Sequence, residues 1–286
     1  MNEAPLPYIA ACPVGCAAAL AETAIVLPEG PLLRCTGCGQ LVSQVSASRY
    51  WETMRAFDEA DYNQPAGREL ERRMRVAQRR LRRIAALTGK PPEEMTLVDV
   101  GCSRGQFVAA AAAMGLRAEG VEPAPAIAAA ARAAGLKVHT GLLQDARYPD
   151  VAFDAVTLFE VLEHLKEPLA LMRECRRILK PGGILCISTG NAASWTVSAM
   201  GPRWDYFQIS RDAGHVSFYN PRSLALLARR SGYTPVDVRT SRVRLTEKGD
   251  VSRWVHALGK AAAELLNLPA RLAGRGHDML AFLRRD

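Results

Sequence analysis

The chain has 286 residues, of which 49% are hydrophobic and 23% charged, a balance that excludes a disordered or fibrous protein. This length suits about two domains, or one large core with a small appendage. No apolar run reaches the roughly 18 residues of a transmembrane helix, and Met1-Asn2-Glu3 lacks the basic start of a signal peptide. We therefore expect a soluble, cytoplasmic protein without an integral membrane segment.

The formal net charge is +8, and part of the excess is local, because eight arginines lie between Arg68 and Arg83. Such a segment can face nucleic acid, an anionic membrane or an acidic substrate. Apolar residues also recur at helical spacing between Leu70 and Ile84, so the same arginines can form the solvated face of a helix. We favour the solvated face and keep the binding surface as an alternative.

Four of the seven cysteines fall within the first 40 residues, as the pairs Cys12/Cys16 and Cys35/Cys38. In a cytoplasmic chain, paired cysteines indicate a metal site rather than disulfides. Four thiolates would bind zinc with no open position, which makes the predicted site structural. A segment this short needs the metal for its stability. We predict a zinc-binding module over residues 1–45; four unpaired reduced thiols are the alternative.

After a helical linker or cap predicted over residues 46–92, strands and helices alternate. The expected strands are 96–100, 117–121, 137–140, 153–159 and 184–189, with helices from about 106, over 124–134 and over 160–179. A helix at 221–231, a strand at 235–240, an amphipathic helix at 251–268 and a strand near 279–283 follow. This alternation predicts an α/β, doubly wound, Rossmann-like domain over 93–286, with a seven-stranded, mostly parallel sheet. The C-terminal helix and last strand occupy 250–284.

A glycine-rich loop follows the first of these strands, in the order Val98-Asp99-Val100-Gly101-Cys102-Ser103-Arg104-Gly105. Glycines permit a tight turn and let the backbone approach a ligand at a helix N-terminus. About 20 residues later Glu122 ends the next strand, where an acid accepts the ribose hydroxyls of an adenosine ligand. Because Asp99 beside this loop would repel a diphosphate, the pattern favours a cationic ligand over a nicotinamide dinucleotide.

Two further segments carry a family resemblance. Residues 153–165, which read Phe-Asp-Ala-Val-Thr-Leu-Phe-Glu-Val-Leu-Glu-His-Leu, and Leu179-Lys180-Pro181-Gly182-Gly183 resemble the class I S-adenosylmethionine-dependent methyltransferases. The resemblance covers roughly residues 95–240. The cysteine pairs and the Glu-Val-Leu-Glu-His segment look like the branch of sugar and antibiotic O- and C-methyltransferases, to which ubiquinone-biosynthesis O-methyltransferases are closely related.

The resemblance implies that S-adenosylmethionine is the cofactor. Its methionine part would be lined by Asp99, Gly101, Cys102, Ser103 and Gly105, its ribose bound by Glu122, its adenine by Asp145 or Gln144, and its amino group by the carbonyl of Phe159. Ser103 departs from the family, which usually has a glycine there, but serine is small enough for the loop. Asp145 can instead be a loop-capping residue.

Glu160, Glu163 and His164 follow the fourth strand at spacings that would place them on one face of the expected helix. With His215 they form a candidate set for a divalent ion such as Mg²⁺ or Mn²⁺. The set resembles the metal site of small-RNA 2′-O-methyltransferases and of some ubiquinone-pathway enzymes, where the ion binds adjacent acceptor hydroxyls. The ion would lower the pKa of the acceptor hydroxyl. Alternatively, His164 acts as a metal-free general base, with His215 and Glu160 as further catalytic candidates, or the segment is a structural helix start.

Residues 190–220 show no regular periodicity but hold six aromatic residues: Trp195, Trp204, Tyr206, Phe207, Phe218 and Tyr219. A long irregular segment in a compact domain is usually functional, so we interpret it as a loop that covers the acceptor. The alternative is that its aromatic rings plug the edge of the sheet. We expect the late amphipathic helix at 251–268 to pack on the core or on a second subunit rather than on a membrane.

The sequence thus predicts a methyltransferase that uses S-adenosylmethionine and acts on a hydroxyl group of a small molecule or glycan. A sugar C-methyltransferase is less favoured, since those of this branch carry a further large C-terminal domain. An RNA 2′-O-methyltransferase, with the cysteine module and arginine helix as a nucleic-acid surface, is an alternative, and a non-catalytic scaffold is another. The acceptor and the oligomeric state do not follow from the sequence.

Overall fold

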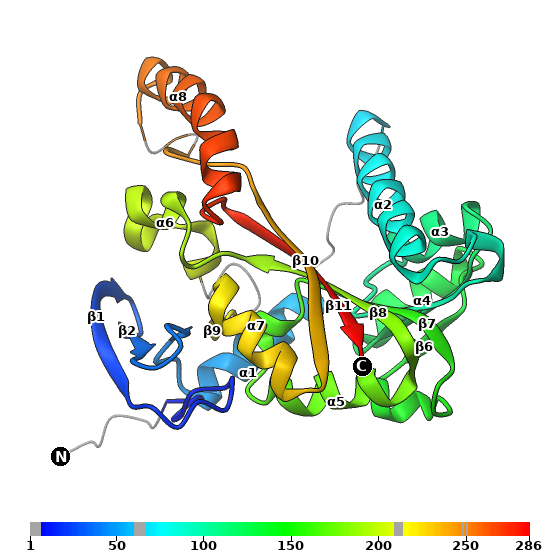
Figure 1. The fold of residues 1–286 in the computed structure, drawn as a ribbon. Helices are drawn as coiled ribbons and strands as arrows, with labels where there is room; N and C mark the ends of the chain where they lie inside the picture. The colour runs from blue at the N-terminus through cyan, green and yellow to red at the C-terminus, as the bar shows by residue number, and fades with distance from the viewer. Residues whose placement is uncertain (1–6, 60–66, 209–213, 248, 250) are drawn as a thin grey trace.

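The computed structural model describes residues 7–59, 67–208, 214–247, 249 and 251–286 (Figure 1). These residues form two sheets, a seven-stranded sheet in the order β10-β11-β8-β7-β4-β5-β6 and a four-stranded sheet in the order β1-β2-β3-β9. The larger sheet holds β4 (Thr96–Val100), β5 (Arg117–Glu122), β6 (Val138–Thr140), β7 (Phe153–Phe159), β8 (Leu179–Gly190), β10 (Tyr233–Ser241) and β11 (Asp278–Arg285).

The strands from β4 to β8 run parallel, whereas β11 pairs antiparallel with both β8 and β10. Six of the seven residues of β7 are buried, as expected for a parallel strand that is covered on both faces. The predicted Rossmann-like, seven-stranded, mostly parallel sheet is confirmed.

Helices cover both faces of this sheet. They are α2 (Gly67–Thr88), α3 (Gln106–Ala113), α4 (Pro125–Ala133), α5 (Pro168–Ile178) and α7 (Pro221–Arg230), with short 3-10 segments η1 (Pro92–Glu94) and η2 (Leu143–Ala146). On one face, α5 and α7 pack against strand residues such as Val98 and Ile187. On the other face, α2 and α3 pack against residues such as Leu97 and Cys186. Alternate residues of each strand therefore serve two different cores.

The helix expected over residues 160–179 is wrong in its first part. Glu160 has a left-handed backbone with φ 56°, and the 3-10 segment η3 (Leu162–His164) follows it. The helix α5 begins only at Pro168, since proline fits the first helical position and disfavours helical backbone in the residue before it. Glu160, Glu163 and His164 consequently do not share a helix face.

The smaller sheet joins the N-terminal segment to residues 217–218. It contains β1 (Leu20–Leu27), β2 (Gly30–Cys35), β3 (Leu41–Val42) and β9 (Ser217–Phe218), all antiparallel. Between β8 and β9 lie α6 (Trp195–Met200), η4 (Gly201–Arg203) and η5 (Asp205–Phe207), so the segment expected to be irregular contains short regular elements. Trp204, Phe207 and Phe218 are buried against residues of the first three strands, which favours the edge-plugging alternative for these rings.

Residues 46–92 are helical where they are described, in α1 (Ala47–Glu59) and α2. The apolar stripe of α2 is confirmed, since Ala77, Leu81 and Ile84 are buried. Several arginines lie on the outer face, where Arg72 and Arg73 pair with Glu69 at half-exposed positions. These pairs match the solvated-face interpretation.

The amphipathic helix expected at 251–268 is α8 (Arg253–Leu272), which projects beyond the body of the molecule (Figure 1). We expected its apolar side to pack on the core or on a second subunit. The first of these is wrong, because most of its large apolar side chains are exposed, whereas the second stays a prediction. Although α8 is long, none of the helices in the described part of the chain is both long enough and apolar enough to cross a bilayer.

Candidate active site

The glycine-rich loop connects β4 to α3 and adopts backbone that only glycine adopts freely. Gly101 has φ 71° and Gly105 has φ 76°. A Cβ atom on Gly101 would lie 2.7 Å from a methyl group of Val161, so a side chain at this position would displace the segment that follows β7. Ser103, where the family usually has glycine, also has positive φ, at 49°. The loop therefore tolerates serine at the cost of some backbone strain.

The carboxylate of Glu122 holds this loop in place. It accepts hydrogen bonds from the backbone N–H of Ser103 at 2.8 Å and from that of Ala124 at 2.9 Å. Only 7% of Glu122 is exposed. Its location at the end of β5, beside the loop, is the one predicted for a ribose-binding acid, and its two bonds also tie the loop to the start of α4.

Asp99 is buried at the end of β4 and accepts a 2.5 Å hydrogen bond from the hydroxyl of Thr157 on β7. Burial raises its pKa to about 7, an effect that the Thr157 bond and the positive charge of Arg80 partly oppose. A carboxylate in this state gains from a cationic ligand, because the ligand's charge favours its ionised form.

The sequence analysis missed Arg80 as a site residue. Its guanidinium carbon lies 4.5 Å from the centre of the Phe159 ring, in a cation–π contact, and Phe107 packs edge-on against the same ring. The helical pattern held a signal, because position 80 falls one turn from both Ala77 and Ile84, the buried side of α2. Arg80 is thus directed toward the ends of β4 and β7, unlike its exposed neighbours.

Three predicted cofactor residues are placed differently from the loop glycines. The thiol of Cys102 is buried against Gly120, and burial raises its pKa, so its side chain belongs to the core and only its backbone faces the loop. The carboxylate of Asp145 accepts a 2.8 Å bond from the backbone N–H of Leu142, which is the loop-capping alternative. Gln144 and Asp145 are both exposed, and their role toward adenine stays a prediction.

The structure brings together three of the four residues predicted to bind a divalent ion. Ligand atoms of Glu163, His164 and His215 all lie within 4.8 Å of one another, and the two imidazole rings are 4.7 Å apart between centres. The side chains come from η3 and from the residues just before β9. They meet although 50 residues separate the histidines in the chain, so backbone proximity alone does not explain the cluster.

Glu163 is completely buried, and neither of its carboxylate oxygens has a hydrogen-bond partner of acceptable geometry among the described residues. Burial, together with the neighbouring charge of Glu160, raises the pKa of this carboxyl well above its usual range. A buried carboxylate without hydrogen bonds is unfavourable unless a cation pairs with it. The donor set of one carboxylate and two imidazoles fits a divalent ion.

His215 is held in one orientation by the fold. Its Nδ1 lies 3.0 Å from the backbone carbonyl oxygen of Tyr206, so we assign the proton to Nδ1 and the free lone pair to Nε2. Burial and the nearby His164 lower its pKa to about 3, which keeps the ring neutral at physiological pH. A neutral imidazole whose other nitrogen donates to a carbonyl is the usual form of a metal-binding histidine.

Glu160, the fourth predicted ligand, lies beside this group rather than within it. It accepts hydrogen bonds from Ser188 at 2.8 Å and from the hydroxyl of Tyr206. The Tyr206 ring also stacks on His215, with 5.2 Å between ring centres. Sequence analysis named Tyr206 only as one of several loop aromatics, whereas the structure makes it a wall of the cluster.

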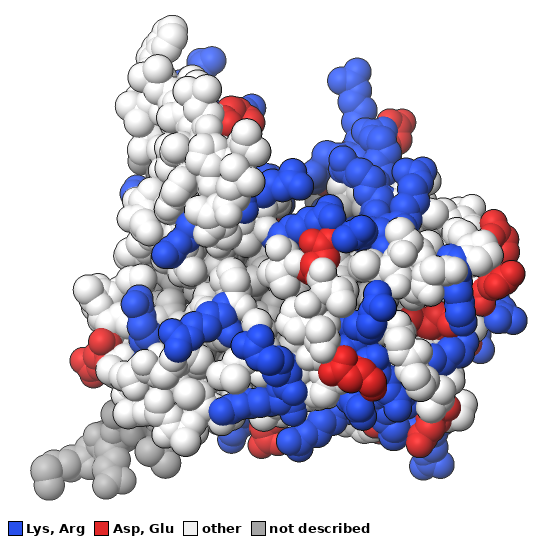
Figure 2. Space-filling view, in the orientation of Figure 1, with Lys and Arg blue, Asp and Glu red and all other residues white. Residues whose placement is uncertain are grey.

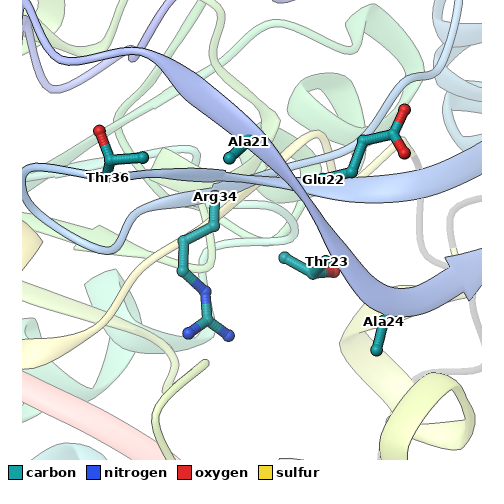
Figure 3. A pocket seen from close by; sticks show the side chains of 6 residues that line it. All are labelled: Ala21, Glu22, Thr23, Ala24, Arg34 and Thr36. Carbon is teal, nitrogen blue, oxygen red and sulfur yellow. The ribbon is translucent and has the colours of Figure 1, made fainter.

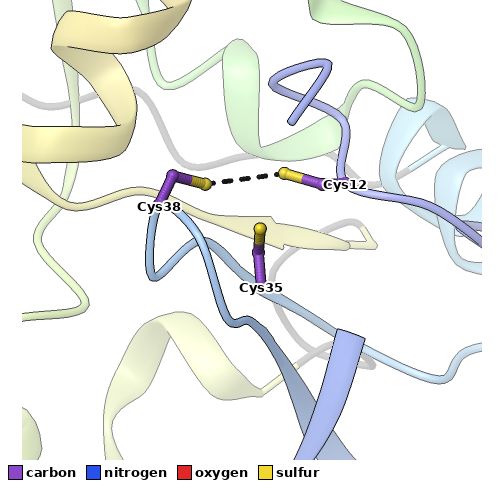
Figure 4. Close-up of side chains that lie close together, drawn as sticks. All are labelled: Cys12, Cys35 and Cys38. Atoms are coloured by element: carbon purple, nitrogen blue, oxygen red, sulfur yellow. Dashed lines mark hydrogen bonds between the residues drawn. The ribbon is translucent and has the colours of Figure 1, made fainter. Parts of the chain in front are cut away.

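The N-terminal cysteines form a second cluster. Ligand atoms of Cys12, Cys35 and Cys38 lie within 4.8 Å of one another, and the three side chains point toward a common centre (Figure 4). Cys16 is outside this group but close to it, since a Cβ on Gly37 would lie 2.6 Å from its sulfur. Burial alone would raise the pKa of Cys35, but the backbone N–H groups of Cys38 and Gly37 bring it down to about 7. Such a thiol readily supplies the thiolate that a metal requires.

Two surface hollows lie elsewhere. One, of about 270 Å³, is on the N-terminal sheet, where Figure 3 shows Glu22 and Arg34 pointing in different directions. The other, of about 410 Å³, is lined mainly by arginines, among which Arg176 donates to the carbonyl of Gly232. Neither is lined by the glycine loop or by the Glu163 cluster. The candidate site stays at the carboxyl ends of β4, β5 and β7, where ligands bind in sheets of this kind.

Comparisons with known proteins identify the family of this domain. A family described as "Methyltransferase domain" matches residues 68–238. The ubiquinone biosynthesis O-methyltransferase of Xanthomonas axonopodis pv. citri is 30% identical over 186 residues, which cover 58% of this chain and 77% of that protein. Its counterpart in Xanthomonas campestris pv. campestris strain B100 is 30% identical over 192 residues, covering 60% and 79%.

Solved structures show the same fold. A SAM-dependent methyltransferase from Archaeoglobus fulgidus superposes with a TM-score of 0.53 at 18% identity, covering 74% of this chain and 94% of that one. Geranyl diphosphate C-methyltransferase from Streptomyces coelicolor A3(2) gives 0.53 at 19% identity, covering 85% and 100%. With the family match over more than half of its length, the chain belongs to the methyltransferase-domain family and is a class I S-adenosylmethionine-dependent methyltransferase.

Proposed function

We propose that this methyltransferase transfers its methyl group to a hydroxyl group of a small molecule or glycan. The observation that carries the proposal is the buried, unpartnered carboxylate of Glu163 beside His164 and His215. This cluster follows Val161, which packs on Gly101 of the glycine loop, so acceptor chemistry and cofactor loop adjoin. The hydroxyl-methylating names of the curated relatives support the same choice of acceptor atom.

For the cofactor, we propose that S-adenosylmethionine lies on the glycine loop from Gly101 to Gly105. Asp99 and Phe159 flank its methionine part, Glu122 binds its ribose, and Gln144 or Asp145 lies near its adenine. Arg80, through its place over Phe159, closes the α2 side of this pocket. The bonds from Glu122 to the loop support a pocket that is formed before the cofactor binds.

A divalent ion fits the second cluster, and Glu163, His164 and His215 would hold it, with Glu160 beside them. When bound, Mg²⁺ or Mn²⁺ lowers the pKa of an acceptor hydroxyl and orients it. The backbone carbonyl of Tyr206 keeps Nε2 of His215 unprotonated, and the hydroxyl of Tyr50 fixes the backbone of His164 at 2.8 Å. Residues outside the cluster therefore hold the ring of His215 and the backbone of His164.

His164 is half-buried whereas His215 and Glu163 are buried, so His164 is the member that an acceptor can reach. In the absence of an ion, we assign to it the proton of the acceptor hydroxyl. With an ion bound to this imidazole, its lone pair would be occupied and the proton of the acidified hydroxyl would pass to solvent. The hydroxyl oxygen then attacks the methyl carbon in line, from about 3 Å, as the bond from carbon to sulfur breaks. The reaction releases S-adenosylhomocysteine and the methylated acceptor.

We also propose a structural Zn²⁺ ion held by Cys12, Cys35 and Cys38, with Cys16 as the fourth ligand. Cys12 and Cys38 already lie 3.6 Å apart between sulfurs. The module is attached to the body by the bond from Arg230 to the carbonyl of Val14 at 3.0 Å and by that from Asn220 to the carbonyl of Gly39 at 2.9 Å. Its metal would therefore stabilise the contact with α7 as well as the module itself.

The test of the hydroxyl-transfer proposal uses the variants His164→Ala and His215→Ala, each assayed with and without a chelator followed by Mn²⁺. Release of S-adenosylhomocysteine is measured against a panel of catechols, vicinal diols and glycans. We expect both variants to bind S-adenosylmethionine normally by calorimetry and to lose turnover. His256→Ala, on α8, is the matched control and keeps full turnover.

Metal binding is tested without an acceptor, by Mn²⁺ titration followed by electron paramagnetic resonance. Wild type is expected to bind Mn²⁺, and the His215→Ala variant to bind it at least about tenfold more weakly. Turnover that survives chelation but disappears in His164→Ala would refute the metal and leave a metal-free base. Turnover that survives both histidine substitutions would refute the assignment of this cluster to acceptor chemistry.

A further inference from the structure

The helix α8 has an unusual distribution of side chains. Its buried residues are small, Ala263 and Ala270, and of its large apolar side chains Leu266 is partly buried against the same cluster. A Cβ on Gly259 would lie 2.9 Å from the hydroxyl of Thr246, so this side of the helix sits close to the chain that follows β10. The helix thus contributes little apolar area to the core.

Most of its large apolar side chains lie on the opposite side, in solvent. The most exposed of them are Trp254 at 83%, Leu258 at 71%, Leu265 at 81%, Leu268 at 63% and Leu272 at 80%. They follow one another at spacings of three, four or seven residues, so they form one continuous strip along the helix, which we call the α8 strip. A contiguous apolar surface of this kind marks a binding surface for a protein or a membrane.

The charges near the α8 strip are almost all positive. Residues 253–275 contain Arg253, Lys260, Arg271 and Arg275 but a single acid, Glu264, which is bonded to Asn267. Figure 2 shows that α8 presents a mostly uncharged surface and that Lys and Arg side chains gather over α2. With three cations and one acid in α8, and Arg275 just after it, the residues beside the strip carry a net positive charge that complements an anionic partner.

We propose that α8 docks this protein on the surface of an anionic phospholipid bilayer. The α8 strip enters the interface between headgroups and acyl chains, and the cations beside it contact lipid phosphates. The helix lies on the bilayer and does not cross it, because charged residues are spread from Arg253 through Lys260 to Arg271. This occupant differs from the core or second subunit that we expected from the sequence.

A second copy of the chain fits the α8 strip less well. Alternating spacings of three and four residues can form a helix pair, as in a coiled coil. Pairing two copies through the strip, however, brings the cations of one helix beside those of the other, with only Glu264 to oppose them. Like charges at such distances are unfavourable, whereas a layer of lipid phosphates neutralises all of them.

Docking through α8 would also orient the active site. In the chain, α8 connects β10 to β11. The strand β11 also pairs with β8, which contains Ser188. Ser188 donates a hydrogen bond to Glu160 beside the acceptor cluster. Binding to the bilayer through α8 requires neither methyl transfer nor metal.

The experiment is co-sedimentation of the full chain with vesicles of phosphatidylcholine alone and of phosphatidylcholine mixed with phosphatidylglycerol. We expect binding to the mixed vesicles, weakened by salt. The variant Leu258→Ser/Leu265→Ser/Leu268→Ser should bind at least about tenfold more weakly, since it removes three apolar anchors. Lys260→Glu/Arg271→Glu should lower binding by about fivefold for each cation replaced. Val26→Ser, at an exposed apolar residue of β1, is the matched control and should change nothing.

A second readout locates the helix in the lipid. Trp254 fluorescence is expected to shift to the blue on mixed vesicles and to be quenched by brominated acyl chains, and the variant Trp254→Phe should lose both signals. All these positions are exposed, so the variants keep the fold, which their affinity for S-adenosylmethionine verifies. That affinity and the turnover assay are independent of vesicles, so failure here leaves the proposed function untouched.

Three results would overturn the proposal. One is absence of binding to the mixed vesicles at low salt. Another is equal binding to neutral vesicles that the charge substitutions do not alter. The third is a dimer, seen by analytical ultracentrifugation, that the triple serine variant dissociates and that does not bind vesicles, because a second copy would then cover the α8 strip.

Discussion

The cofactor side and the acceptor side of the active site contain buried carboxylates in opposite conditions. Glu122 uses its two oxygens to bind backbone N–H groups, and Asp99 is bonded to Thr157. Glu163, two residues after Val161 in the sequence, has no such bond among the described residues. Complete bonding indicates a pocket that the chain builds by itself, whereas the unbonded Glu163 indicates a place where a cation belongs.

The most direct test of this difference between the two sides is the variant Glu163→Gln. We expect turnover to fall by about 10²- to 10⁴-fold, the usual contribution of a group that acts on the transferred proton or its environment. The affinity for S-adenosylmethionine, measured by calorimetry, should stay within about twofold of wild type. A variant that turns over normally would show that the bare carboxylate is only a structural feature. Mn²⁺ binding should fall in parallel with turnover.

A fourth buried carboxylate, Asp154, sharpens the comparison because it is fully paired and lies at the start of β7, away from the candidate site at the strand's other end. It accepts hydrogen bonds from Lys90 at 2.6 Å, Lys180 at 2.8 Å and Thr96 at 2.7 Å. Asp154→Asn removes a buried charge from its partners and should lower the free energy of unfolding by about 2 to 3 kcal/mol. The loss is not larger because both lysines are half-exposed, so that solvent screens the ion pairs. Urea unfolding measures this loss, and affinity for the cofactor should not change.

The same residue gives a pH dependence of stability. Burial alone would raise the pKa of Asp154, but the two lysines and Thr96 hold it well below its usual range. Its stabilisation is therefore complete above the unfolded pKa near ~4 and is lost as the pH falls toward the lower folded pKa. The difference in unfolding free energy between wild type and Asp154→Asn should shrink on acidification below about pH 4. A constant difference would argue against the ion pairs.

On the cofactor side, Gly101→Ala tests whether the loop is built as closely as the structure shows. We expect a roughly tenfold loss of affinity for S-adenosylmethionine, because the new methyl group meets Val161 and the backbone has φ 71°. Gly182→Ala is the matched control, since φ there is 74° but nothing lies within 4 Å of the added atom. Equal effects of the two variants on cofactor affinity would remove the contact with Val161 from the explanation.

The smallest expected effect concerns Asp99. Burial raises its pKa to about 7, so lowering the pH from 8 to 6 protonates it in the free protein. A neutral Asp99 attracts a cationic cofactor less, and affinity for S-adenosylmethionine should fall several-fold across this range. Asp99→Asn should flatten the dependence. An affinity that rises on acidification would show that Asp99 does not face the positive charge.

Parts of this site follow from local sequence. Gly101, Gly105 and Glu122 lie at a strand end, a helix start and the next strand end, and alternation of strands and helices over 96–140 places all three. The cluster of Glu163, His164 and His215 was predicted from residue types, but its geometry was attributed to a helix that Pro168 prevents from starting at Glu160. Short-range spacing cannot distinguish a helix face from a 3-10 turn.

Other features depend on contacts between distant residues and were not predictable. The pairing of β3 with β9 joins Leu41 to Phe218, and it converts the expected acceptor loop into part of a second core. The contact between Arg80 and Phe159 depends on the position and angle at which α2 packs on the sheet. For α8, the sequence shows an amphipathic pattern, but only tertiary packing decides which side faces the protein.

The pairing of β3 with β9 has a practical consequence for anyone who dissects this enzyme. β9 begins two residues after His215, and its partner strand belongs to the first 45 residues. A fragment that contains only the methyltransferase region would expose Phe218 and Trp204 to water. It would also remove the strand that holds β9, and with it the segment of His215, in place. Truncation, oxidation of the N-terminal thiols and loss of the metal that we propose for them should then all abolish activity in the same way, by displacing His215.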